Sequence, residues 1–130
     1  MNLAPEIKKL IEEAWKVREH AYTPYFRFPV GAAVLTKDGR IFAGCNVENA
    51  APTATVCAEG TAIGNAISSG KLKFKAIAVV GPEKDFVFPC GTCRQRLFEF
   101  NPKMDVYMAK RNGDVKHVTI EQLLPNPFKL

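Results

Sequence analysis

The sequence predicts an α/β fold in which a mixed sheet of five strands is flanked by helices. Segments with helical spacing of apolar residues alternate along the chain with short runs rich in β-branched residues. The predicted order is helix, strand, strand, helix, strand, helix, strand, strand, helix. The strand expected at residues 76–80 is apolar at every position, which indicates that both faces of the sheet are covered.

Length and composition fit one globular domain over residues 1–130. With 47% hydrophobic and 24% charged residues, a chain of 130 residues can build its own core. No apolar run approaches the ~20 residues of a membrane span. Glu6, Lys8 and Lys9 stand where a signal peptide would need its apolar stretch. We therefore expect a cytoplasmic, single-domain protein that does not bind a membrane.

A helix followed by a β-hairpin is expected in the first third of the chain. Pro5 suits the first turn of a helix, and apolar residues follow at helical spacing until the turn-forming residues 22–24. The hairpin has its strands at residues 28–35 and 41–46, on either side of a Lys-Asp-Gly turn at residues 37–39.

Helices and strands alternate in the rest of the chain. Residues 56–68 carry a small apolar face at helical spacing, and Gly70 is a suitable C-terminal cap. Strand, helix, strand and strand are then expected at residues 76–80, 93–100, 105–109 and 115–119. Thr119 and Gln122 can form the capping box of a final helical turn.

The chain has four cysteines, which raises the choice among disulfides, a redox pair and a metal site. Cys90 and Cys93, taken alone, suit a redox pair or a metal site. A reducing compartment disfavours disulfides. Cys57, followed two positions later by Glu59, favours the metal site, because three thiolates can occupy three corners of a zinc tetrahedron.

These three cysteines fall at the predicted starts of two helices, where partial positive charge favours the thiolate. The candidates for a fourth protein ligand are weak, because Cys45 lies on a predicted strand and His20 and His117 belong to elements remote in sequence from both motifs. A zinc ion with three protein ligands keeps a position for water, as catalytic zinc sites do. Glu59 projects to another side of its helical turn, where it can move protons between that water and a substrate.

The motifs together resemble the short, tetrameric cytidine deaminases. Zinc deaminases carry His or Cys, then Glu two positions later, followed by P-C-x-x-C. The segments that carry the resemblance are PYFRFPVGA (24–32), GCNVENA (44–50), VCAE (56–59), PCGTCRQ (89–95) and EQLLP (121–125). The resemblance implies a three-layer α-β-α cytidine deaminase-like fold with one Zn²⁺ per subunit, held by Cys57, Cys90 and Cys93. It also implies hydrolytic deamination of cytidine and deoxycytidine to uridine and deoxyuridine plus ammonia, a step of pyrimidine salvage, with Glu59 as the proton shuttle.

The resemblance also implies roles in substrate binding. Phe28 would stack on the pyrimidine, Asn46 and Glu48 would hold the ribose hydroxyls, and the backbone around Ala58 would hydrogen-bond the base. Phe128 matches an aromatic residue that closes the site of a neighbouring subunit. The expected assembly is therefore a homo-oligomer, a tetramer in the family.

The sequence departs from the family pattern at two places. Gly60 stands where the family has an arginine that donates to the zinc thiolates, and Arg94 is the predicted substitute. Pro52 stands where the family has a tyrosine near the substrate and a subunit contact.

Two alternatives remain open from the sequence. Blasticidin S deaminases, which act on a cytosine-containing antibiotic, resemble residues 55–64 and also lack the arginine at position 60. A weakly active relative that binds nucleosides or nucleic acid has the support of Gly60 and of the net charge of +5. The basic residues are scattered and form no stripe, so a nucleic-acid partner is not expected.

Overall fold

The five strands form one mixed sheet in the order β2-β1-β3-β4-β5 in the computed structural model, which describes residues 2–130. The pair β3–β4 is parallel and the other neighbouring pairs are antiparallel. The strands are β1 (Gly31–Thr36), β2 (Ile41–Cys45), β3 (Phe74–Val80), β4 (Asp105–Ala109) and β5 (Val115–Thr119).

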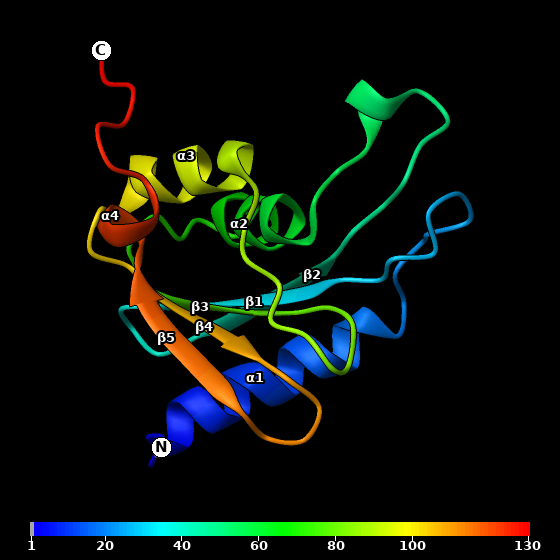
Figure 1. Cartoon of the computed structure of the whole chain (residues 1–130). Coiled ribbons are helices and arrows are strands. Elements are labelled where there is room, and N and C mark those ends of the chain that lie inside the picture. Colours follow the sequence, from blue (N-terminus) through cyan, green and yellow to red (C-terminus); the bar gives the residue numbers. More distant parts are fainter. Residues whose placement is uncertain (1) are drawn as a thin grey trace.

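Helices cover both faces of this sheet, which makes three layers (Figure 1). One face carries α1, and the other carries α2, α3 and the single turn of α4. The helices are α1 (Pro5–Arg18), α2 (Ala58–Ser68), α3 (Gly91–Phe100) and α4 (Ile120–Leu123), with a 3₁₀ turn, η1, at Pro52–Ala54. The predicted fold class and order of elements are confirmed. Within residues 2–130, no helix is both long and apolar enough to cross a bilayer.

The largest difference from the predicted boundaries lies before β1. The predicted strand began at residue 28, but β1 begins at Gly31, because the side chain of Asn46 binds the backbone of residues 28 and 30 and holds this segment outside the sheet. Helix α3 begins at Gly91, earlier than predicted, so that Cys90 becomes its N-cap. The capping interaction predicted for Gln122 is present, with its Oε1 accepting the Thr119 N–H at 2.8 Å.

Two strand glycines bring the helices close to the sheet. A Cβ atom on Gly44 of β2 would lie 2.4 Å from the Ala62 backbone nitrogen in α2. A Cβ atom on Gly31 of β1 would lie 2.1 Å from the Ala14 carbonyl oxygen in α1. Only glycine allows such contacts between backbones. The position of α2 therefore depends on Gly44, and so does the position of the side chains in the first turn of α2.

Candidate metal centre and active site

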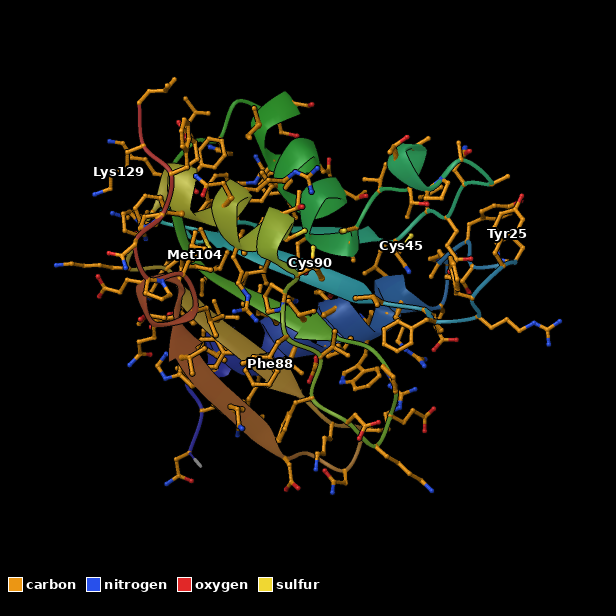
Figure 2. The ribbon with its side chains drawn as sticks, turned by 45° about the horizontal axis from the view of Figure 1, so that its top comes forward. Tyr25, Cys45, Phe88, Cys90, Met104 and Lys129 are labelled. Atoms are coloured by element: carbon orange, nitrogen blue, oxygen red, sulfur yellow. The ribbon has the colours of Figure 1, made fainter. Side chains whose placement is uncertain are left out.

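Two helix N-termini bring three cysteine side chains together. Cys57 is the N-cap of α2, Cys90 is the N-cap of α3, and Cys93 lies in the first turn of α3. Their Sγ atoms all lie within 4.8 Å of one another, and the Cys57 and Cys90 sulfurs are 4.0 Å apart. Figure 2 shows Cys90 at the end of α3 that faces the start of α2.

The three sulfurs fit a tetrahedral zinc ion. Sulfurs bound to zinc at ~2.3 Å in a tetrahedron lie roughly 3.8 Å apart, close to the distance between the Cys57 and Cys90 sulfurs. Neither helix has a side-chain cap hydrogen bond at its N-terminus, so backbone N–H groups of the first turns remain available to thiolates. Cys45, His20 and His117 are not among the side chains that converge here within the described part of the chain.

The three thiols differ in burial, with Cys93 buried, Cys57 half-buried and Cys90 exposed, and their pKa values differ accordingly. Burial raises the pKa of the Cys57 and Cys93 thiols, and the neighbouring negative groups raise the pKa of Cys93 further. At Cys90 burial acts in the same direction, but hydrogen bonds from the Cys93 backbone and the neighbouring thiols outweigh it and lower the pKa. A bound divalent cation supplies the positive charge that keeps such thiols deprotonated.

Glu59 is a buried carboxylate beside the three sulfurs. Only 5% of its surface is exposed, and burial raises its pKa, whereas a hydrogen bond with Cys93 and the charge of Arg96 lower it. Its carboxylate is not part of the group of converging ligand atoms. A buried acid with a raised pKa, next to a metal site but outside the ligand set, is suited to accept and return a proton.

The segment that carries Phe28 is held by the two polar residues after β2. Glu48 is 5% exposed, and its Oε1 accepts the N–H groups of Tyr25 and Phe26 at 2.9 and 3.0 Å. Asn46 accepts the Val30 N–H through Oδ1 and donates through Nδ2 to the Phe28 carbonyl, both at 2.9 Å. Both side chains therefore position this segment, and Phe28 stays 44% exposed.

The other predicted substrate-binding residues lie in contrasting surroundings. Ala58, in the first turn of α2, is fully buried. Phe128 is 70% exposed, while its backbone is held by the side chain of Gln95 in α3 through hydrogen bonds of 3.0 and 3.3 Å. Pro52 begins the exposed η1 turn, which projects away from the sheet (Figure 1).

The arginine that contacts a sulfur is Arg96, and this corrects the prediction for Arg94. The Arg94 guanidinium donates to the carbonyls of Pro89, just before α3, and of Leu123, the last residue of α4, at 2.7 and 2.8 Å. Arg96 Nη1 lies 3.5 Å from Cys93 Sγ. Helical spacing made Arg96 a possible neighbour of Cys93, since residues three apart on a helix lie close together, but this spacing alone does not say where the guanidinium points.

Comparisons of the sequence with known proteins identify a matching family and several relatives. The family model described as "Cytidine and deoxycytidylate deaminase zinc-binding region" matches residues 5–109. The chain is 50% identical over 124 residues to the cytidine deaminase of Sporosarcina psychrophila, covering 95% of this chain and 91% of that protein. It is 39% identical over 132 residues to the blasticidin-S deaminase of Bacillus cereus, covering 95% of this chain and 93% of that protein.

A solved structure gives the same result for the fold. The crystal structure of cytidine deaminase from Burkholderia pseudomallei superposes with a TM-score of 0.89 at 45% sequence identity, covering 93% of this chain and 98% of that chain. The matched zinc-binding region includes Cys57, Cys90 and Cys93, the cluster that can hold the metal ion.

Proposed function

The chain belongs to the cytidine and deoxycytidylate deaminase family, and on that premise we propose that it is a zinc-dependent hydrolase that deaminates cytidine and deoxycytidine. One observation supports this most strongly: the buried Glu59 carboxylate lies beside three converging thiols at two helix N-termini. Zinc at Cys57, Cys90 and Cys93 would supply a Lewis acid that makes water nucleophilic at neutral pH.

Glu59 carries the proton transfers in this proposal. It accepts a proton from the attacking water as the oxygen bonds to C4 of the pyrimidine, and it delivers a proton to N3. Glu59 then takes the second proton from the new hydroxyl at C4 and gives it to N4, so that the C4–N4 bond breaks, a C4 carbonyl forms and N4 leaves as ammonia. Water and cytidine are thereby converted to uridine and ammonia, with atoms and charge balanced. The raised pKa of Glu59 suits a group that must both accept and donate a proton.

The substrate would lie against the segment before β1. The exposed Phe28 ring can stack on the base, and the backbone at Ala58 can hydrogen-bond its polar edge. Asn46 and Glu48 already bind this segment, and each keeps hydrogen-bonding capacity for the ribose hydroxyls. These two residues would thus link sugar recognition to the position of Phe28.

Assembly is part of the proposal. Phe128 is exposed, with its backbone fixed to α3, and it is available to the site of a neighbouring subunit in a homotetramer. We assign the activity to residues 1–130 as one domain, with a nucleoside as partner. Four free thiols suit the reducing cytoplasm. Light scattering on the purified protein tests the assembly: a tetramer supports it and a monomer contradicts it.

The activity is tested by following the ultraviolet spectrum of cytidine and deoxycytidine with zinc-loaded protein. We expect uridine products and stoichiometric ammonia. Blasticidin S and cytosine serve as matched alternative substrates, because they share the reacting C4 amine but lack the ribose. Turnover of blasticidin S without turnover of cytidine would replace the proposed substrate. If none of these compounds were deaminated, the proposed function would be contradicted.

A further inference from the structure

Arg96 reaches from α3 across the start of α2. Its Nη1 lies 3.5 Å from Cys93 Sγ, and a Cβ atom built on Gly60 would lie 3.1 Å from the same nitrogen. Although much of Arg96 is exposed, its guanidinium head occupies the space that a side chain at position 60 would fill. The two positions therefore compete for one volume beside the cluster.

The contacts of Arg96 differ from those of an ordinary surface arginine. Glu99 lies three positions later on the same helix, where exposed ion pairs commonly form. Within residues 2–130, however, no carboxylate oxygen lies within 4.0 Å of the Arg96 guanidinium. The hydrogen bond that the guanidinium makes is directed to the sulfur of Cys93.

The negative charges at the cluster make a cation at this contact favourable. A divalent ion held by three thiolates keeps one uncompensated negative charge, and the buried Glu59 adds a second when ionised. Arg96 is the cation that the structure places against this charge from the α3 side. A guanidinium cannot be deprotonated in a protein, so its charge is permanent.

On the basis of the proposed function, we infer that Arg96 is a positioning residue of the metal centre. It stabilises the Cys93 thiolate and the bound metal. Because Gly60 has no side chain, it leaves room for the Arg96 guanidinium. A cation delivered from position 60 would serve the same purpose. The cation beside the cluster can therefore come either from position 96, with glycine at position 60, or from position 60 itself.

The test compares Arg96→Gln, Arg96→Lys and the transposed double variant Gly60→Arg/Arg96→Gln with the unchanged protein. Arg111→Gln is the matched control, because the guanidinium of this exposed arginine packs on the ring of Trp15 in α1, on the opposite face of the sheet. Zinc affinity is measured by competition with a chelator, and thiolate ligation by the charge-transfer absorption of the Co²⁺-loaded protein. Neither readout requires cytidine, so both remain informative if the proposed substrate is wrong. Circular dichroism verifies that each variant is folded.

We expect Arg96→Gln to weaken zinc binding by about tenfold or more and to shift the Co²⁺ absorption, since removal of partners of metal ligands typically costs 10–100-fold in affinity. Arg96→Lys should restore part of the loss. The double variant should bind zinc at least about threefold more tightly than Arg96→Gln, and Arg111→Gln should match the unchanged protein. A folded Arg96→Gln protein with unchanged zinc affinity and absorption would overturn the inference, as would a double variant no better than the single one.

Discussion

The two faces of the sheet pack against their helices in the same way but bury different kinds of side chain. On each face the backbone of a helix lies close against a strand glycine, α1 against Gly31 and α2 against Gly44. The α1 face is filled by small and aliphatic side chains, including Ala33, Ala76 and Ala78. The other face also has an apolar core, but the first turns of its helices hold thiols and the buried carboxylate of Glu59.

This contrast separates stability from chemistry within one small fold. Burial of apolar side chains stabilises both faces, whereas burial of ionisable groups costs free energy unless a partner compensates. The buried carboxylate of Glu48, after β2, is compensated by two backbone N–H groups, whereas Glu59 and the thiols at the starts of α2 and α3 are the groups that call for a cation. Changes on the α1 face should therefore reduce stability without altering the reaction, and changes at the helix ends should do the reverse.

The largest expected effect is on turnover. Glu59→Gln should lower kcat by about 10³-fold or more, because proton transfer by a positioned side chain typically contributes 10²–10⁴-fold. Zinc content should stay the same, since the Glu59 carboxylate is outside the group of ligand atoms. Steady-state kinetics and metal analysis on the same preparation check both parts. If the variant lost its zinc, Glu59 would have to be reassigned as a ligand.

Two matched glycine substitutions compare the faces directly. Gly31→Ala and Gly44→Ala each place a methyl group within 2.1 to 2.4 Å of helix backbone atoms, so each should lower the free energy of unfolding by about 3 kcal/mol. Only Gly44→Ala should also weaken zinc binding, because it displaces α2, whose N-cap is Cys57. Chemical denaturation and chelator competition measure the two effects. Equal loss of zinc affinity in both variants would mean that the faces are not independent.

The smallest effect is expected far from the site, at the hairpin turn. A hydrogen bond from Lys71, at 2.7 Å, and one from Thr36 lower the pKa of Asp38 to about 2. A carboxylate whose pKa is lower when folded stabilises the fold above its unfolded pKa of about 3.9, and this contribution disappears as the pH falls towards 2. Because Asp38 is exposed, the effect should be small.

Asp38→Asn should therefore lower the melting temperature slightly at pH 7 and flatten its dependence between about pH 4 and 2. Thermal unfolding across this pH range measures the change, and kinetics at pH 7 should be unaffected. An unchanged pH dependence in the variant would show that Asp38 is not the responsible group.

Most of the fold could be predicted from the sequence because local signals agreed with the tertiary structure. The bounds of β4 and β5 were predicted without error, since the alternation of buried residues in β4 and the turn at residues 112–113 between the two strands are local signals. The start of β1 was missed because Asn46, distant in sequence, binds the backbone before it. A hydrogen bond between segments far apart leaves no local pattern in the sequence.

The same distinction holds at the candidate site. The grouping of the three cysteines could be predicted because they lie at the starts of two helices, which local signals indicate, while the role of Glu59 stays a prediction. The choice between Arg94 and Arg96 depended on the direction of each side chain from α3, and the sequence does not contain that direction. The positioning roles of Asn46 and Glu48 also required coordinates, because each acts on the segment before β1.

We propose that Cys57, Cys90 and Cys93 hold a zinc ion that keeps one coordination position open for water. X-ray absorption at the zinc edge of the purified protein tests this most directly. We expect three sulfur ligands at about 2.3 Å and one oxygen or nitrogen ligand at about 2.0 Å. Four sulfur ligands, with Cys45 completing a closed structural site, would contradict it, and so would coordination by oxygen and nitrogen alone.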